Sequence, residues 1–210
     1  MKKYKAVLFD FDGVIGKTMD DNYNAWRYAL SKYNIDITKN EYFQLEGMST
    51  TKTAEYFLSE NSKSIRKAKE VVEDKEDYFL KNNKFSVYTD VKSLLPYLKK
   101  KGYSLGLVSG GSFKRIAKSL SNKLLKYFDV VLTSDRVKKC KPHPEPYLTA
   151  AKMLSVKPYY CLAVENAPLG IESAKRAKMD CIAITSTLDK KYLKKADKII
   201  KKLGELRRIL

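Results

Sequence analysis

The chain has 210 residues, of which 44% are hydrophobic, and its 42 lysines and arginines outnumber 24 aspartates and glutamates, which gives a formal net charge of +18. This length and apolar content predict one folded domain, or a domain with an insertion, and argue against a disordered chain. No apolar stretch approaches the roughly 20 residues of a membrane-spanning helix, and residues 6–9 are too few for a signal peptide. We therefore expect a soluble, cytoplasmic protein that has no membrane partner.

The positive charge has two competing interpretations. It can form a surface for nucleic acid, or it can be a lysine-rich exterior that steers anionic metabolites toward a site. The lysines are spread along the whole chain, and no RNA-binding aromatic motif, zinc finger or basic zipper accompanies them. We therefore do not expect a nucleic acid as the partner.

The first predicted element is a buried strand that ends on two acids. The apolar run Ala6 to Phe9 is followed by Asp10, Phe11, Asp12 and a glycine, which can adopt turn conformations closed to other residues. Ligands of α/β proteins bind outside the carboxyl ends of the parallel strands. The two carboxylates are therefore candidates for chemistry.

Residues 16 to about 85 have a helical pattern. We expect helices at 19–33, 38–47, 51–59 and 64–80; the second opens with a capping box formed by Thr38 and Glu41 and ends at Gly47. The pattern alone fits either the first helical layer of one domain or a separate helical insertion.

The remainder of the chain alternates strands with helices. Strands are predicted at 103–108, 128–132, 159–164, 180–184 and 198–200, helices lie between them, and a last helix is predicted at 204–210. Such alternation predicts an α/β fold with a parallel sheet covered by helices on both faces. The carboxyl ends of all its strands then share one edge.

Polar residues occur repeatedly after these strands. Ser109 and Gly110 begin a glycine-rich turn between a strand and a helix, an arrangement suited to binding a phosphate. Lys141 lies in a proline-stiffened turn, and Glu165 and Asn166 end the strand at 159–164. We expect these residues to converge with the first two aspartates.

These motifs carry a resemblance to a known family. Asp-Phe-Asp-Gly-Val-Ile at 10–15, Lys-Pro-x-Pro-x-x-Tyr from Lys141, and the pair Glu165 and Asn166 resemble the first, third and fourth motifs of the haloacid dehalogenase-like hydrolases, which are mostly magnesium-dependent phosphatases. The resemblance implies a Rossmann-like catalytic core at 1–15 and 86–210. It also implies an all-helical cap domain, inserted at 16–85.

The resemblance also implies roles for the site residues. Asp10 would attack phosphorus to form an aspartyl-phosphate, and Asp12 would donate a proton to the leaving group and later accept one from water. Ser109 and Gly110 would hold the phosphoryl oxygens, while Lys141 would balance their charge.

The cofactor implied in the same way is Mg²⁺. Its ligands would be the Asp10 carboxylate, the Asp12 backbone carbonyl, Glu165 and Asn166. Many relatives have aspartate at the position of Asn166, so this chain has one negative charge fewer around the metal.

Among the haloacid dehalogenase-like hydrolases, the chain resembles the branch with phosphoglycolate phosphatases, sugar-phosphate phosphatases and β-phosphoglucomutase. Gly47-Met48-Ser49 resembles a cap segment of the mutases, but Thr50 stands where these carry an arginine for a second phosphate. In addition, Lys17 and Asn22 replace an acidic residue and a histidine of the mutases.

We therefore expect a phosphatase that hydrolyses a small phosphorylated metabolite, either a sugar phosphate or a phosphoglycolate-like ester. Gly47, Ser49 and Lys52 are the expected substrate contacts of the cap, and Lys52 could replace the missing arginine of a mutase. The alternatives are a β-phosphoglucomutase-like mutase and a non-catalytic phosphate- or nucleic-acid-binding protein on a hydrolase scaffold. The sequence does not indicate an oligomeric state.

Overall fold

The computed structural model describes residues 3–210, and within them six parallel strands form one sheet in the order β3-β2-β1-β4-β5-β6. The strands are β1 (Ala6–Phe9), β2 (Ser104–Val108), β3 (Val130–Leu132), β4 (Cys161–Glu165), β5 (Asp180–Ile184) and β6 (Lys198–Ile200). The α/β fold with a parallel sheet, predicted from the alternation of elements, is confirmed.

Strand β1 lies in the middle of the sheet, with Phe9 in register with Leu107 of β2 and Val164 of β4. Alternate residues of a strand point to opposite faces. Accordingly, Leu8 belongs to one apolar cluster of the core and Phe9 to the other. Burial on both faces explains why the strand is a continuous apolar run.

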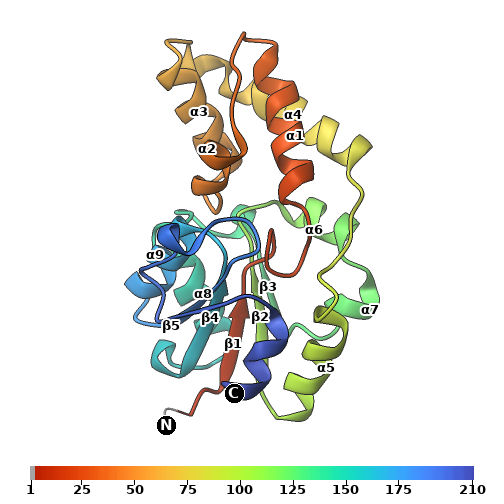
Figure 1. Cartoon of the computed structure of the whole chain (residues 1–210), viewed down its shortest axis with the longest axis vertical. Helices are drawn as coiled ribbons and strands as arrows, with labels where there is room; N and C mark the ends of the chain where they lie inside the picture. The colour runs from red at the N-terminus through yellow and green to blue at the C-terminus, as the bar shows by residue number, and fades with distance from the viewer. Residues whose placement is uncertain (1–2) are drawn as a thin grey trace.

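Helices cover both faces of the sheet. Helices α8 (Glu145–Met153) and α9 (Pro168–Arg176) contribute to the cluster of Leu8, whereas α5 (Val91–Lys100), α6 (Phe113–Ser119) and the 3₁₀ segment η5 (Leu203–Arg208) contribute to the cluster of Phe9. The first described residues and the C-terminus lie at the amino edge of the sheet (Figure 1). The carboxyl edge is thereby left for the site.

Four helices form a separate group beyond the carboxyl edge, which we call the helical block (Figure 1). They are α1 (Met19–Ser31), α2 (Lys39–Gln44), α3 (Thr50–Glu60) and α4 (Ala68–Asn82), and the short 3₁₀ segment η1 (Ile65–Lys67) precedes α4. Trp26 of α1 is buried among aromatic rings of α2 and α3, 6.3 Å from Tyr42 and 6.4 Å from Phe57. Trp26, Tyr42 and Phe57 belong to the same apolar cluster as Leu8 of the sheet. The proposed domain limits at 16–85 stay a prediction.

The capping box that opens the second helix is confirmed: the Thr38 hydroxyl accepts from the Glu41 amide, and the Glu41 carboxylate accepts from the Thr38 amide. The ends of several elements differ from prediction. Residues 158–160 form a 3₁₀ turn (η3) where we expected the start of a strand, and a short helix, α7 (Asn122–Leu125), was not predicted. The closing segment is a 3₁₀ helix, and at its start the Glu205 carboxylate accepts from the backbone amides of Lys201 and Lys202.

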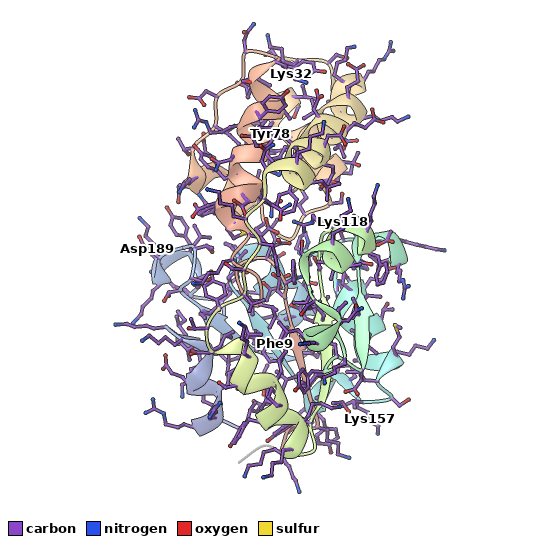
Figure 2. All side chains as sticks on the ribbon, turned by 90° about the vertical axis from the view of Figure 1, so that its right-hand side faces the viewer. Phe9, Lys32, Tyr78, Lys118, Lys157 and Asp189 are labelled. Carbon is purple, nitrogen blue, oxygen red and sulfur yellow. The ribbon has the colours of Figure 1, made fainter. Side chains whose placement is uncertain are left out.

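The remaining 3₁₀ segments, η2 (Ser134–Arg136) and η4 (Lys190–Tyr192), lie in loops. Charged side chains extend from the periphery, as Lys32, Lys118 and Lys157 illustrate, while Phe9 lies in the interior (Figure 2). Among residues 3–210, no helix combines the length and the apolar character that crossing a membrane requires.

Asp129 ties the edge of the sheet to α5, which gives a pH-dependent prediction. Its carboxylate accepts from Lys99 at 2.7 and 2.8 Å and from the Leu105 amide at 2.8 Å. Partial burial opposes ionisation, but these hydrogen bonds win and lower the pKa of Asp129 below its ordinary value. The stabilisation is therefore present above the unfolded-state pKa and is lost as pH falls through the lower, folded-state pKa.

We expect Asp129→Asn to lower the thermal midpoint by about 2 °C at pH 7, because the pair with Lys99 is partly exposed to solvent. The difference from wild type should shrink below about pH 4, where the carboxylate takes up a proton. Thermal unfolding at both pH values measures this. Asp77→Asn, at an exposed position of α4, is the control and should not show the pH dependence.

Candidate active site

The carboxyl edge of the sheet gathers the site residues predicted from the sequence. Asp10 directly follows β1, Ser109 follows β2, and Glu165 and Asn166 lie at the end of β4. All four side chains are buried, with 0 to 5% of their surface exposed. Lys141 reaches the same place from the loop between β3 and α8 and is 3% exposed.

The Lys141 ammonium is the centre of this cluster. It donates to Asp10 Oδ1 at 2.5 Å, to Glu165 Oε1 at 2.6 Å and to the carbonyl oxygen of Val108 at 3.1 Å. Burial disfavours its charge, but Asp10 and Glu165 more than compensate and raise the pKa of Lys141 above its ordinary value. Lysine 141 is therefore a fixed cation beside Asp10.

The pKa of the Asp10 carboxyl group is set by several opposing effects. Burial raises its pKa well above the ordinary value, Lys141 lowers it, and Glu165 and Asp12 raise it again. A carboxylate of this kind is poorly solvated, and only one of its oxygens is bonded to Lys141. Hydration therefore reduces the nucleophilicity of Asp10 less than that of an exposed carboxylate.

Glu165 is fixed by three donors. Its Oε1 accepts from Lys141 and from the Tyr147 hydroxyl, both at 2.6 Å, and its Oε2 accepts from the backbone N–H of Asn166 at 3.2 Å. A Cβ atom at Gly170, in the first turn of α9, would stand 2.0 Å from Oε1 and 2.3 Å from Oε2. Only glycine lets α9 approach this carboxylate.

We expect Gly170→Ala to displace the Glu165 carboxylate, break its contact with Lys141 and reduce catalytic turnover by about tenfold or more. Turnover measured with saturating substrate checks this result. Gly102→Ala is the matched control for a lost glycine, since a Cβ there meets nothing within 4 Å, although its positive φ costs some stability. Unchanged turnover in Gly170→Ala would contradict the expectation that catalysis requires the observed position of the Glu165 carboxylate.

Asp12 is bound by three side chains from other elements. Arg115 of α6 forms a two-pronged ion pair with both of its oxygens, and Thr18 and Asn22 donate to Oδ1. Burial raises the pKa of Asp12, but Arg115 and Thr18 outweigh it and hold that pKa below the ordinary value. Asn22 belongs to α1, so Asp12 also forms a contact between the core and the helical block.

The donor set at the strand ends fits a magnesium ion. Two buried oxygen atoms, Asp10 Oδ2 and Asn166 Oδ1, find no hydrogen-bond partner among the described residues. Carboxylate and amide oxygens are the hard ligands that Mg²⁺ prefers, and this ion usually keeps several waters. Within residues 3–210, no group of three or more His, Cys, Asp and Glu side chains forms a metal site, so the ion would rely on an amide and a backbone carbonyl as well.

The helical block closes over the cluster. A Cβ at Gly47 would lie 3.0 Å from Lys141 Cδ, and a Cβ at Gly110 would lie 3.2 Å from the carbonyl oxygen of Gly47. One cavity between block and core, which we call the small cavity, has a volume of about 20 Å³. It is lined by residues of both parts: Asn22, Trp26, Tyr42, Leu45, Glu46, Met48, Thr50, Thr53, Lys75, Gly110 and Arg115.

The predicted contacts of the helical block, Gly47, Ser49 and Lys52, are not among the residues that line this cavity. Gly47 packs against Lys141, while Ser49 caps α3 by accepting from the Lys52 amide. The side chain of Lys52 is 68% exposed, and its ammonium pairs with Glu55 at 2.6 Å. Thr50, in the first turn of α3, presents a neutral side chain to the cavity.

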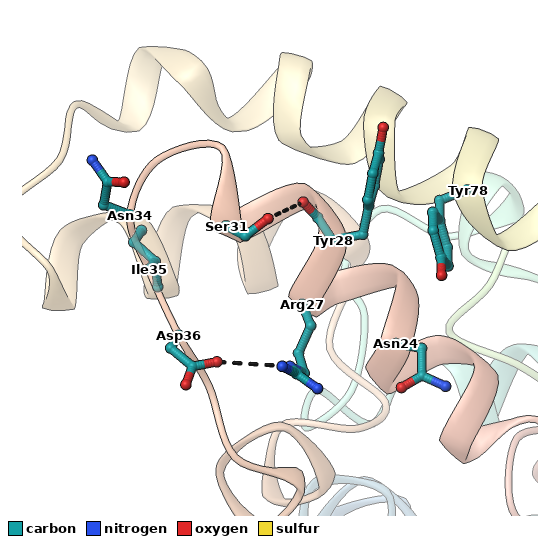
Figure 3. A pocket seen from close by; sticks show the side chains of 8 residues that line it. All are labelled: Asn24, Arg27, Tyr28, Ser31, Asn34, Ile35, Asp36 and Tyr78. Carbon is teal, nitrogen blue, oxygen red and sulfur yellow. Dashed lines mark hydrogen bonds and ion pairs between the residues drawn. The ribbon is translucent and has the colours of Figure 1, made fainter.

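A larger hollow of about 470 Å³ lies on the outer side of the helical block (Figure 3). Its walls include the stacked rings of Tyr28 and Tyr78, with centroids 4.5 Å apart, and the ion pair of Arg27 with Asp36. It contains none of the residues predicted for catalysis. The small cavity is lined by one predicted site residue, Gly110, and by Arg115, which binds Asp12.

Three charged residues of the small cavity were not predicted. Arg115 is 4% exposed, Lys75 is 1% exposed, and Glu46 has its pKa raised by burial and by Asp12. The ammonium of Lys75 pairs with Glu76 at 2.9 Å and lies 5.6 Å from the ring of Trp26. A signal did exist for Lys75, because it shares the apolar face of α4 with Val71 and Phe79.

Known proteins share this sequence pattern and this fold. The sequence profile of haloacid dehalogenase-like hydrolases matches residues 7–184. A validoxylamine A 7'-phosphate phosphatase of Streptomyces hygroscopicus subsp. limoneus is 31% identical over 209 residues, covering 97% of this chain and 96% of that protein. The β-phosphoglucomutase of Bacillus subtilis (strain 168) is 29% identical over 189 residues, covering 86% and 83%.

Solved structures agree with these relatives. A β-phosphoglucomutase of Clostridium difficile superposes with a TM-score of 0.81 at 27% identity, covering 98% of this chain and 96% of that one. A hydrolase of Pseudomonas syringae superposes with a TM-score of 0.87 at 22% identity, covering 98% and 97%, which shows the shared fold. The chain belongs to the haloacid dehalogenase-like hydrolases.

Proposed function

We propose that this protein is a magnesium-dependent phosphatase that hydrolyses a small phosphorylated metabolite through an aspartyl-phosphate at Asp10. The observation that carries the proposal is the buried Asp10 carboxylate, which has one oxygen on Lys141 and the other without a partner among the described residues. Phosphate esters hydrolyse very slowly in water, and an anionic nucleophile is repelled by an anionic phosphate. The positive charge of Lys141, bonded to Asp10, reduces that repulsion.

In the first step, Asp10 attacks phosphorus and the bond from phosphorus to the leaving oxygen breaks. Lys141 keeps its positive charge beside the reacting atoms because Asp10 and Glu165 raise its pKa. A Mg²⁺ ion bound by Asp10, Asn166 and the Asp12 carbonyl would supply further positive charge to the phosphoryl oxygens. Glu165 already accepts three hydrogen bonds, from Lys141, Tyr147 and the Asn166 backbone. We propose that it holds Lys141 and Asn166 in position.

Asp12 is the proposed acid and base. It is ionised as the structure stands, because Arg115 and Thr18 lower its pKa. An incoming phosphoryl group adds negative charge beside it and raises that pKa, which favours the protonated form needed to serve the leaving oxygen. The carboxylate left after this transfer then takes a proton from the water that hydrolyses the aspartyl-phosphate.

The turn after β2 is the proposed seat of the phosphoryl oxygens. The Ser109 oxygen accepts from the Gly111 amide at 3.0 Å, which leaves the hydroxyl hydrogen of Ser109 to donate to the substrate. The Gly110 amide lies in the same turn and adds a second donor. Such prearranged donors favour the charge that develops in the transition state.

The helical block is the proposed cap. A cavity of about 20 Å³ is close to the volume that one water needs, so a phosphate ester enters only when block and core separate. Closure then removes water from the reacting groups and strengthens their electrostatic interactions. The two connections that must bend lie between β1 and α1 and between α4 and α5.

The substrate class follows from the relatives and from the cavity. Relatives include phosphatases for validoxylamine A 7'-phosphate and, in Escherichia coli (strain K12), for fructose 1-phosphate. We propose a sugar phosphate or a similarly small ester, in the cytoplasm, with Gly47 and Thr50 facing it from the cap. Phosphoryl transfer between positions of one sugar is the second candidate, because the buried Lys75 ammonium places a cation in the cavity.

Release of inorganic phosphate from a panel of phosphorylated sugars and organic acids tests the proposal. We expect hydrolysis with Mg²⁺, loss of activity in excess chelator and recovery when Mg²⁺ is returned. Adding glucose 1,6-bisphosphate separates the two candidates, since a mutase needs such a primer and isomerises glucose 1-phosphate. Activity that is unaffected by chelation would contradict the role of the metal.

A further inference from the structure

Arg115 is a buried arginine that pairs with Asp12 and still has N–H groups available for a ligand. Arg115 belongs to the first turn of α6. Helix α6 lies at the junction between the core and the helical block (Figure 1). Within the proposed phosphatase reaction, we propose that Arg115 binds oxygens of the phosphoryl group in transfer and is the second cation of the site beside Lys141.

The first argument is the number of donors that Lys141 has left. An ammonium group has three N–H bonds. Among the residues that the structure describes, Lys141 donates to Asp10, Glu165 and the Val108 carbonyl, at 2.5, 2.6 and 3.1 Å. Unless one of these bonds breaks, Lys141 acts on a phosphoryl group through its charge and has no N–H to give.

Arg115, by contrast, keeps donors in reserve. Nη1 donates to Asp12 Oδ1 at 3.0 Å and to Asn22 Oδ1 at 3.1 Å, and Nη2 donates to Asp12 Oδ2. Nε has no hydrogen-bond partner within the described part of the chain, although the side chain is only 4% exposed. A guanidinium has five N–H bonds, so Nε and the second hydrogen of Nη2 are uncommitted.

These two uncommitted donors belong to adjacent nitrogens of one guanidinium, a fork that matches two oxygens of a phosphate. Leaving a buried N–H without a partner costs about 1–3 kcal/mol. A site that is filled by a ligand during its working cycle explains why the chain tolerates this cost. Arg115 is also one of the residues that line the small cavity, where we propose that the substrate lies.

The second argument is the contact between this guanidinium and the phosphate turn. A Cβ at Gly111 would stand 2.1 Å from Nη2 and 2.5 Å from Nε, closer than any side chain permits. Gly111 is the residue whose amide donates to the Ser109 hydroxyl. Because Gly111 has no side chain, the free donors of Arg115 can lie next to the turn that we propose holds the phosphoryl oxygens.

Binding of inorganic phosphate and of orthovanadate tests this role without requiring turnover. Both probes are titrated in the presence of Mg²⁺ into wild type, Arg115→Gln, Arg115→Lys, Gly111→Ala and Lys118→Gln, and heat is recorded by calorimetry. Lys118 is an exposed lysine of the same helix and controls for the loss of one positive charge. The thermal midpoint of each variant reports whether it is folded.

We expect Arg115→Gln to weaken the affinity for both probes by about tenfold or more. Arg115→Lys should recover part of the loss, and Lys118→Gln should bind as wild type does. Gly111→Ala pushes the guanidinium off the turn and should weaken affinity while leaving every charged group in place. This variant also decides the matter if Arg115→Gln does not fold.

Unchanged affinity for phosphate and orthovanadate in folded Arg115→Gln or in folded Gly111→Ala would overturn the proposal. In particular, a residue that only held Asp12 in position would lower kcat and leave the affinity for orthovanadate as it was. Failure of the proposed function has a different signature: wild type would then bind phosphate but release none from any ester, and the affinity comparison would still decide the role of Arg115. Wild type that binds neither probe would contradict both.

Discussion

Asp10→Asn should reduce phosphate release by about four orders of magnitude or more, while the fold is retained. An amide oxygen is a far poorer nucleophile than a carboxylate, so no aspartyl-phosphate can form at this position. The protein should stay folded because a neutral amide is cheaper to bury than the Asp10 carboxylate, whose pKa is raised by its burial. Lys141 retains Glu165 as its counter-charge in this variant.

Phosphate release at saturating substrate and Mg²⁺ measures the loss, and thermal unfolding measures the fold. Asp135→Asn is a suitable control, since Asp135 is an exposed aspartate in a loop of the same domain. It should hydrolyse the substrate at the wild-type rate. Hydrolysis by Asp10→Asn within tenfold of wild type would show that another residue or a water is the nucleophile.

Lys141→Met should affect stability as strongly as activity. It leaves Asp10 and Glu165 buried side by side, with no cation between them. Removing one partner of a buried ion pair costs about 3–5 kcal/mol, because the remaining charge has neither water nor counter-charge. Loss of the charge beside the phosphoryl group should also lower kcat by about two to three orders of magnitude.

The stability loss of Lys141→Met has a defined pH dependence. Burial already raises the pKa of Asp10, and without the ammonium the repulsion from the neighbouring Glu165 carboxylate raises that folded-state pKa further above the unfolded value. The penalty is therefore largest at neutral and alkaline pH and decreases as pH falls and a proton is taken up. Lys139→Met, an exposed lysine of the same loop, should unfold like wild type at every pH. A penalty for Lys141→Met that does not depend on pH would contradict the ion-pair explanation.

Much of this site could be predicted because its residues lie at the ends of strands. Apolar runs identify buried strands, and the first polar residues after them must lie at one edge of a parallel sheet. That reasoning placed Asp10, Ser109, Glu165 and Asn166 together, and the structure brings them together. Lys141 follows no strand directly, and its prediction depended on the resemblance to the family motif.

The residues that sequence reasoning missed are those whose orientation depends on packing between the two parts of the molecule. Arg115 is one of 42 basic residues, and nothing in its neighbourhood separates it from the exposed Lys114 and Lys118. Only the approach of α6 to Asp12 and Gly111 shows its place. Lys52 is a different case: its position after Gly47-Met48-Ser49 led us to predict a substrate contact, and in the structure its side chain is exposed and pairs with Glu55.

Residue 10 itself provides the most direct test of the mechanism proposed for this enzyme. The protein is mixed with a substrate that it hydrolyses and Mg²⁺, quenched within one turnover and reduced with borohydride, and the peptide carrying residue 10 is analysed by mass spectrometry. An aspartyl-phosphate is reduced to homoserine, so we expect homoserine at position 10 in wild type and none in Asp10→Asn. Rapid turnover with position 10 unmodified, or with the reduction product at another acidic residue, would contradict the assignment of Asp10 as the nucleophile.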